Sequence, residues 1–196
     1  MNLPNYFLAD LPAEAELSPT MLAEACGTLK RNREQYLAPR TTDQIVKFLA
    51  NVAEGWLQTD NPFRKLALAQ GPGKTGFGRP TLARGLDQFF GQLTRENLRA
   101  LLGQELGDAK RLDELIATPG EGKNSRAAIA TGPELLVHIA AGNIPNPTFM
   151  SLVLGLLTRS AQFVKCGSGA AFLPRLFAHS LYDADHKLGA CLEIAE

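Results

Sequence analysis

The chain has little cysteine, no excess of charge of either sign and no long apolar run. Cys26, Cys166 and Cys191 are its only cysteines, and none belongs to a CxxC or CxxH pattern. An odd number at unrelated spacings indicates neither a structural zinc site nor a disulfide framework. A reducing, cytoplasmic compartment is therefore the default expectation. The three histidines share no metal-ligand spacing either, so we predict no metal site.

Charge and hydropathy exclude two further classes of partner. Twenty basic residues balance twenty acidic residues, so no net field attracts nucleic acid or anionic membranes, and we expect neither. No apolar run approaches the roughly 20 residues that cross a bilayer, so we predict no membrane span. The first ten residues lack the basic and apolar regions of a secretory signal. The composition, 45% hydrophobic and 20% charged, is that of an ordinary soluble protein.

Residues 1–117 are predicted to form a helical region. Ser18 and Pro19 are typical of a helix N-cap and first helical residue, and Thr42 is expected to open a second helix. Helical spacing of apolar residues predicts helices over 19–36, 42–56, 63–69 and 80–92, a further helix capped by Thr94, and a loop over 71–78. The first forty residues carry no functional signal.

Gly73-Lys74-Thr75 resembles the end of a phosphate-binding P-loop. The first glycine that such a loop requires falls at Leu68, and no strand precedes it. A P-loop is therefore not predicted.

Residues 118–126, TPGEGKNSR, are predicted to be a connector between the helical region and a second region, 127–196. Residues 127–130 are expected to form a short edge strand. The run 135–169, LLVHIAAGNIPNPTFMSLVLGLLTRSAQFVKCGSG, predicts a strand, a tight turn, a buried helix, a second strand and a loop of small residues. This order is one βαβ unit.

Within this unit the apolar run 135–141 predicts a strand that is buried on both faces. The helix is expected to begin near Pro147 with Asn146 as its N-cap, and the second strand to centre on 163–164. A further helix is predicted over 172–183, with Cys191 in a helical context. We therefore predict an α/β fold: a helical N-terminal region followed by the first βαβ unit of a Rossmann-like cofactor domain. Its sheet is expected to be incomplete in this chain, because a doubly wound sheet needs more strands.

Two polar side chains follow the two predicted strands. Asn143 comes just after the first strand and Lys165 ends the second. Parallel strands end at the same edge of a sheet, and ligands bind at that edge, so we expect the two side chains to face one ligand. The loop Cys166–Gly169 has almost no side-chain bulk, which lets a ligand approach its backbone.

These residues carry a resemblance to the aldehyde dehydrogenase superfamily, and more closely to its fatty acyl-CoA reductase (LuxC-type) branch. The motif His138–Pro145, HIAAGNIP, resembles the His-Ile-Ala-Ala-Gly-Asn-x-Pro motif of that branch. FVKCGSG stands where ordinary aldehyde dehydrogenases have Val-Leu-Lys-Pro-Ser-Glu. The upstream stretches WLQTDNPFRKLAL and TGFGRPTLARGLDQFF also resemble its helical N-terminal region, so the resemblance runs from about residue 42 onward.

The resemblance implies a role for each residue at the edge. Asn143 matches the asparagine that donates a hydrogen bond to the oxyanion, an interaction that can be worth roughly 3 kcal/mol in the transition state. Lys165 matches the lysine that contacts the cofactor ribose, and Ile144 and Pro145 match the turn beside the nicotinamide. Gly167 and Ser168 belong to the cofactor loop. Because Ser168 lacks the carboxylate of many relatives, the resemblance favours NADPH, with NADH possible.

The resemblance implies an enzyme that reduces an acyl-CoA to an aldehyde with NAD(P)H through a cysteine thioester. The family's nucleophilic cysteine and its pyrophosphate turn lie further along, and none of the three cysteines here matches that nucleophile. We therefore expect the N-terminal part of such an enzyme, inactive alone. The resemblance also implies an acyl-CoA substrate, and a homo-oligomer or a subunit of an enzyme complex at full length.

Two alternatives remain open at this point. One is a non-catalytic binding or scaffold module with a remnant nucleotide fold. The other is a fragment of an oxidative aldehyde dehydrogenase, against which the turn GNIP argues, because that turn replaces Pro-Trp-Asn-Phe-Pro. A truncated sheet exposes strand edges, so the chain is also expected to self-associate.

Overall fold

The computed structural model describes residues 3–12, 14–142 and 145–196. The elements before the sheet are η1 (Leu8–Asp10), α1 (Pro19–Asn32), η2 (Arg33–Leu37), α2 (Thr42–Leu57), α3 (Pro62–Thr75), α4 (Arg79–Gln92), α5 (Arg95–Leu106), η3 (Ala109–Leu112) and α6 (Pro119–Gly122). The others are β1 (Leu135–Ile139), α7 (Pro145–Leu157), β2 (Ala161–Lys165), α8 (Phe172–Ala184), α9 (His186–Gly189) and β3 (Leu192–Ala195). None of the helices described is both long enough and apolar enough to cross a membrane.

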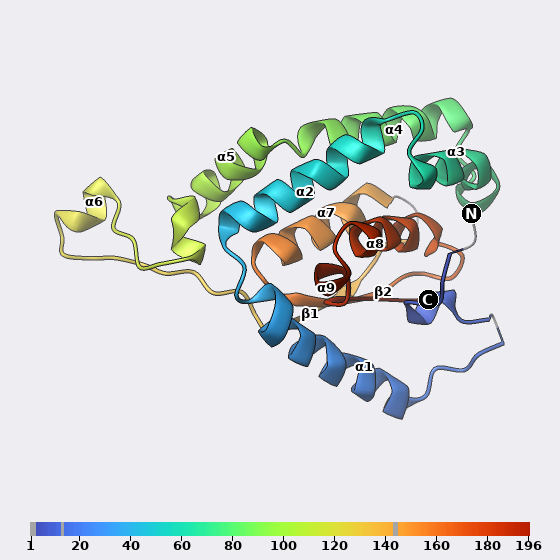
Figure 1. The fold of residues 1–196 in the computed structure, drawn as a ribbon, viewed down its shortest axis with the longest axis horizontal. Coiled ribbons are helices and arrows are strands. Elements are labelled where there is room, and N and C mark those ends of the chain that lie inside the picture. The colour runs from blue at the N-terminus through green and yellow to red at the C-terminus, as the bar shows by residue number, and fades with distance from the viewer. Residues whose placement is uncertain (1–2, 13, 143–144) are drawn as a thin grey trace.

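A small parallel sheet lies between two layers of helices. Its strand order is β1-β2-β3, and both pairings are parallel. Helices α7 and α8 cover one face with α2 and α4 behind them, while α1 lies on the opposite face (Figure 1). Figure 1 also shows α6 and its flanking loops projecting from the body of the protein. The predicted α/β architecture with a small, open parallel sheet is confirmed.

A cluster of buried aromatic rings joins the helical region to the sheet region. Trp56 of α2 stacks on Phe90 of α4, with ring centroids 4.7 Å apart. Phe90 also meets Phe177 of α8 edge-on at 5.4 Å, and Phe177 lies 5.1 Å from Phe149 of α7. One continuous apolar core therefore contains residues from both predicted regions. The boundary proposed at residues 118–126 stays a prediction.

Helix α1 supplies the cover for the second face of the sheet. The Ser18 hydroxyl accepts a hydrogen bond from the Met21 N–H, and Pro19 follows it as the first helical residue, as predicted. Leu29 of α1 packs against Ala161 and Phe163 of β2 in a small separate core. The first forty residues thus complete the layered architecture, a role that their sequence did not indicate.

Strand β1 is more exposed than its apolar sequence predicts. The side chains of Val137 and Ile139 are 59% and 79% exposed, so the prediction of a strand buried on both faces was wrong. Leu135 packs into the core beneath α1, but that helix leaves the following part of the face uncovered. No described residue outside β2 pairs with β1. The predicted self-association stays a prediction.

Helix α3 is twice as long as its sequence predicts. The loop expected over 71–78 is wrong, because the helix continues through Pro72 and ends where Gly76 adopts a positive φ of 75°. Gly71 packs so closely on α4 that a Cβ there would lie 2.8 Å from Leu82 Cδ1. This tertiary contact holds the helix together across a proline that would otherwise end it.

Helix α2 begins at Thr42, as predicted, and Thr41 caps it in a reciprocal capping box with Gln44. Two other element boundaries need correction. Helix α7 already includes Pro145, so Asn146 lies within the helix and does not cap it. The strand expected over 127–130 is reduced to a single antiparallel bridge, Ile116 with Ala128.

The end of the chain also differs from its prediction. Residues 192–195 form a third strand that was not predicted, and Cys191 lies in the turn before it, not in a helix.

A buried glutamine fixes α7 to the sheet. Gln162 of β2 donates its amide Nε2–H to the Leu152 carbonyl oxygen at 3.0 Å, and its Oε1 lies 3.1 Å from His138 Nε2. His138, which is half-buried, is therefore held by a hydrogen bond to a fully buried side chain. Gly155 of α7 makes room for this amide, because a Cβ there would lie 2.1 Å from Gln162 Cδ.

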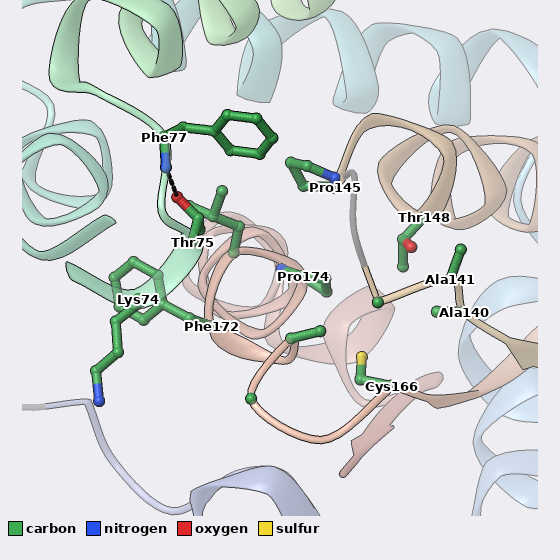
Figure 2. A pocket seen from close by; sticks show the side chains of 14 residues that line it. Lys74, Thr75, Phe77, Ala140, Ala141, Pro145, Thr148, Cys166, Phe172 and Pro174 are labelled. Carbon is green, nitrogen blue, oxygen red and sulfur yellow. Dashed lines mark hydrogen bonds between the residues drawn. The ribbon is translucent and has the colours of Figure 1, made fainter. Parts of the chain in front are cut away.

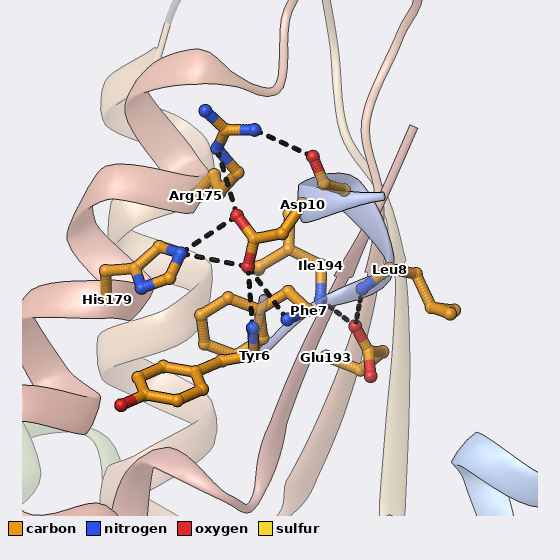
Figure 3. Close-up of polar contacts among 9 residues, drawn as sticks. Tyr6, Phe7, Leu8, Asp10, Arg175, His179, Glu193 and Ile194 are labelled. Carbon is orange, nitrogen blue, oxygen red and sulfur yellow. Dashed lines mark hydrogen bonds and ion pairs between the residues drawn. The ribbon is translucent and has the colours of Figure 1, made fainter. Parts of the chain in front are cut away.

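The N-terminal segment is fastened to α8 and β3 by two carboxylates (Figure 3). Asp10 accepts hydrogen bonds from His179 Nε2 at 2.9 Å and from the Tyr6 and Phe7 N–H groups at 3.0 and 2.9 Å. Glu193 of β3 accepts from the Leu8 N–H at 2.7 Å. Residues far apart in the sequence are thereby held together at the edge of the sheet.

The two carboxylates have pKa values shifted in opposite directions. Burial alone would raise the pKa of Asp10, but the hydrogen bonds from His179 and the Phe7 and Tyr6 N–H groups outweigh burial and lower it. Burial raises the pKa of Glu193 to about 7, against hydrogen bonds from the Leu8 and Ile194 N–H groups, and the charge of Asp10 adds to the rise.

Gly155→Ala is expected to destabilise the fold by about 2–4 kcal/mol, because the new methyl group displaces the buried Gln162 amide and breaks its hydrogen bonds. Urea unfolding followed by the fluorescence of Trp56, the single tryptophan, measures this change. Gly91→Ala in α4 is the control, since a Cβ there meets nothing within 4 Å. The control is expected to gain about 0.5–1 kcal/mol from helix propensity. Equal stabilities for the two variants would contradict the packing described.

Stability is expected to fall as the pH rises from about 4.5 to 7. In this window the folded chain keeps a proton on Glu193, whose pKa is about 7, whereas the unfolded chain has lost it at its ordinary value of 4.5. Glu193→Gln retains an oxygen that accepts from Leu8 and Ile194 but does not ionise. The unfolding free energy of Glu193→Gln minus that of the wild type should therefore increase by about 1–3 kcal/mol from the lower to the upper end of this pH window. If the unfolding free energies of the two proteins changed with pH in parallel, the raised pKa of Glu193 would be refuted. Asp10, whose pKa is lowered, contributes its stabilisation above pH 3.8 and loses it only below.

Candidate ligand-binding edge

The carboxyl ends of β1 and β2 lie side by side. Ile139 and Lys165 are register partners in the parallel ladder, and the Ala140 N–H donates to the Lys165 carbonyl oxygen at 2.9 Å. The two loops that follow these strands therefore leave the sheet at the same edge. This is the edge at which open α/β sheets bind their ligands.

Glycine allows the two loops to touch. A Cβ on Gly167 would lie 3.3 Å from the Gly142 Cα, so a larger residue at 167 would push the loops apart. Gly169 adopts a positive φ of 72°, which favours glycine, and its N–H donates to the Glu196 carboxylate beyond β3. The loop after β2 is thus tied to both neighbouring strand ends.

A cavity of about 70 Å³ opens at this edge (Figure 2). The strand ends and their loops contribute Ala140, Ala141, Gly142, Cys166, Gly169 and Ala170. Helices α7 and α8 contribute Pro145, Thr148, Phe172, Leu173 and Pro174, and the end of α3 with the turn after it contributes Lys74, Thr75 and Phe77. Whole-ligand sites are usually about 300–1,000 Å³, so this cavity has room for one group of a larger ligand.

The predicted site residues are distributed around this cavity. Pro145 lines it. Lys165, Gly167 and Ser168 belong to the same strand end and loop but are not among the residues that line it, and the side chains of Lys165 and Ser168 are exposed. Asn143 and Ile144 lie outside the described residues, so the structure does not test their predicted positions.

Lys165 keeps donors available at the edge. Its Nζ donates to the Cys166 carbonyl oxygen at 2.6 Å. An ammonium carries three N–H donors, so two remain for a ligand.

Sequence reasoning missed the contribution of the helical region. Thr75 Oγ1 donates to the Gly71 carbonyl oxygen at 2.8 Å and accepts from the Phe77 N–H at 3.3 Å, which shapes the turn that carries Phe77 to the cavity. In Figure 2 the Lys74 side chain extends away from Cys166, so its ammonium does not point into the cavity. The resemblance of Gly73-Lys74-Thr75 to the end of a P-loop does not indicate this position, because only the packing of α3 on α8 brings these residues to the edge.

The described residues were also searched for clusters of metal-ligating side chains. Across residues 3–12, 14–142 and 145–196, no group of three or more histidine, cysteine, aspartate or glutamate side chains is arranged to hold a metal ion.

Neither buried cysteine has the character of a nucleophile. Burial raises the pKa of the Cys166 thiol to about 11, and the negative charge of Glu196 adds to this rise. Burial raises the pKa of Cys191 to about 12. A reactive cysteine needs a lowered pKa and access to solvent, and both thiols have the opposite properties. Cys26, which is partly exposed, lies in α1 on the far face of the sheet.

Parallel strands whose carboxyl ends carry short glycine-containing loops are typical of α/β proteins that bind nucleotide-type ligands. The sequence model of one family, described as "Acyl-CoA reductase (LuxC)", matches residues 37–194. The chain belongs to this acyl-CoA reductase family, as its resemblance predicts. A comparison with curated proteins finds no match.

The three thiols are expected to differ in their reactivity toward an alkylating reagent. Iodoacetamide at pH 8 should modify Cys26 in the folded chain and leave Cys166 and Cys191 intact, because their raised pKa values and burial suppress the thiolate. Mass spectrometry of the digested protein measures each site. The same treatment in urea is the control and should modify all three. Rapid modification of Cys166 in the folded chain would reverse this view and make it a candidate nucleophile.

Proposed function

We propose that this chain contributes a cofactor edge and an oxyanion donor to the NADPH-dependent reduction of a fatty acyl-CoA to its aldehyde. The observation that carries the proposal is the parallel register of Ile139 with Lys165, which directs the loops after β1 and β2 to one cavity in a member of the acyl-CoA reductase family. The Rossmann-like character of the sheet and its place in the aldehyde dehydrogenase superfamily are part of this proposal.

The Asn143 amide is proposed to stabilise the oxygen that becomes negative when a thiolate attacks the acyl carbonyl. Gly142 and Pro145, which flank Asn143 and Ile144 in the sequence, both line the cavity, which supports this role. A donor of this kind can contribute roughly 3 kcal/mol in the transition state. The attacking thiolate is not one of the three cysteines of this chain, since Cys166 and Cys191 are buried with raised pKa values and Cys26 lies on the far face of the sheet.

The loop after β2 fits a dinucleotide by its shape. Gly167 packs closely on Gly142 without a side chain between them, and Ser168 is exposed beside this contact. Lys165 is proposed to donate to the cofactor ribose, with Gly167 and Ser168 presenting their backbone, and Ile144 and Pro145 to flank the nicotinamide. When bound, the cofactor supplies the hydride that releases the aldehyde.

NADH is the second candidate cofactor, and one observation favours it. The Glu196 carboxylate lies at the same edge, where it accepts a hydrogen bond from the Gly169 N–H. A 2′-phosphate close to this carboxylate would be repelled, whereas a ribose hydroxyl would not be. Ser168 favours NADPH instead, because it brings no negative charge to the loop that would repel a 2′-phosphate.

Titration with NADPH and NADH tests the cofactor edge. Energy transfer from Trp56 to the reduced nicotinamide reports binding. Lys165→Ala is expected to weaken binding about 10- to 100-fold, since a hydrogen bond from a charged donor is worth about 1.5–3 kcal/mol. Lys47→Ala, at an exposed position on α2, is the matched control and should bind as the wild type does. Equal affinities for the two variants would exclude Lys165 from the site.

The same protein should form no aldehyde from dodecanoyl-CoA and NADPH, because it lacks a suitable thiolate. Aldehyde formation by residues 1–196, measured by mass spectrometry, would overturn the proposal that the nucleophile lies elsewhere.

A further inference from the structure

A second cavity adjoins the first, between α4 and the start of α7. Its volume is about 140 Å³. It is lined by Phe77, Thr81, Leu82, Gly85, Leu86, Pro145, Asn146 and Leu173. Phe77, Pro145 and Leu173 line both cavities, so the two spaces adjoin at these side chains. In Figure 2 the rings of Phe77 and Pro145 face one another above the strand ends.

The second cavity is a hydrocarbon-lined groove. Three almost fully buried leucines, Leu82, Leu86 and Leu173, form much of its lining. None of the described residues that line it is charged. Gly85 leaves one side open, since a Cβ there would meet nothing within 4 Å. Among the described lining residues only Thr81 and Asn146 have polar side chains. Such a lining suits an alkyl group, because two neutral polar side chains are too few to replace the water contacts of a phosphate or a ribose.

We infer that this groove holds the alkyl chain of the acyl substrate, with the thioester end directed to the first cavity. The inference rests on the proposed function and adds the position of the substrate's alkyl chain. It is supported by the position of an uncharged, leucine-lined groove directly beside the cavity at the strand ends, with three lining residues shared between them.

The groove volume sets the length of chain that it accepts. An apolar cavity of about 150 Å³ holds benzene, a ligand of six carbons. The groove of about 140 Å³ therefore holds about six carbons of a chain. Affinity should rise by about fourfold for each methylene that is fully buried, which corresponds to about 0.8 kcal/mol, and level off once the groove is full.

The test is calorimetric titration of the protein with CoA and with five acyl-CoA esters below their micellar concentrations: butyryl-, hexanoyl-, octanoyl-, decanoyl- and dodecanoyl-CoA. Gly85→Leu places a side chain in the groove. Gly91→Leu makes the same substitution on the same helix, at an exposed site where a Cβ also meets nothing within 4 Å. Both variants gain similar helix propensity, so their difference isolates the groove.

The wild type and Gly91→Leu are expected to bind more tightly with each added carbon until the groove is full, and with constant affinity beyond that length. Gly85→Leu is expected to lose at least tenfold in affinity for the longer chains while keeping its affinity for CoA. An unchanged dependence on chain length in Gly85→Leu would overturn the groove assignment and leave the proposed reductase function in place. Failure of every CoA ester to bind the wild type would overturn both. Binding of esters no tighter than CoA would overturn the groove alone, because the NADPH titration tests the cofactor edge separately.

A second measurement does not depend on the folding of a variant. Wild-type protein is irradiated with hexanoyl-CoA that carries a diazirine near the chain end, a chain that the groove can hold in full. Labelling at Phe77, Leu82, Leu86 or Leu173, located by mass spectrometry, is the expected result. Labelling confined to the exposed Val137 and Ile139 of β1 would place the chain on the sheet surface and overturn the inference.

Discussion

The architecture depends on the buried aromatic cluster around Trp56. Its indole N–H donates to Ser180 Oγ at 2.8 Å, and its ring stacks on Phe90, so α2, α4 and α8 are fixed to one another without a buried unpaired donor. Phe149 and Phe177 extend the contact to the two helices that lie on the sheet. The strand ends therefore owe their position relative to the helical region to this cluster.

Both candidate binding features follow from that constraint. Helix α4 presents Phe89 and Phe90 to the aromatic cluster and, one to two turns earlier, Leu82 and Leu86 to the groove beside α7. Because cores are close-packed, the groove cannot shift without disturbing the aromatic contacts on the same helix. Gly85 is the glycine of this helix that lines the groove and leaves space there, so a side chain at this position would control the size of a bound alkyl chain.

Sequence reasoning succeeded where the signals were local. Ser18 and Thr94 cap their helices as predicted, because capping needs only side-chain oxygens within three residues of free N–H groups. It failed for α3, since Pro72 is a strong local stop signal that the packing of Gly71 on Leu82 overrides. It also failed for the exposure of Val137, because an apolar run indicates a strand but does not indicate which helices cover it.

The amino-acid sequence by itself determined the family, the parallel βαβ unit and the strand ends that form the candidate binding edge. These properties reside in contiguous residues, such as His138–Pro145 and the loop after Lys165. Only the tertiary structure decided that Phe77 and Leu82 border the same edge and that α1 covers the far face of the sheet. The reason is physical: these contacts join segments that are tens of residues apart, and shape complementarity between packed helices, not local periodicity, selects them.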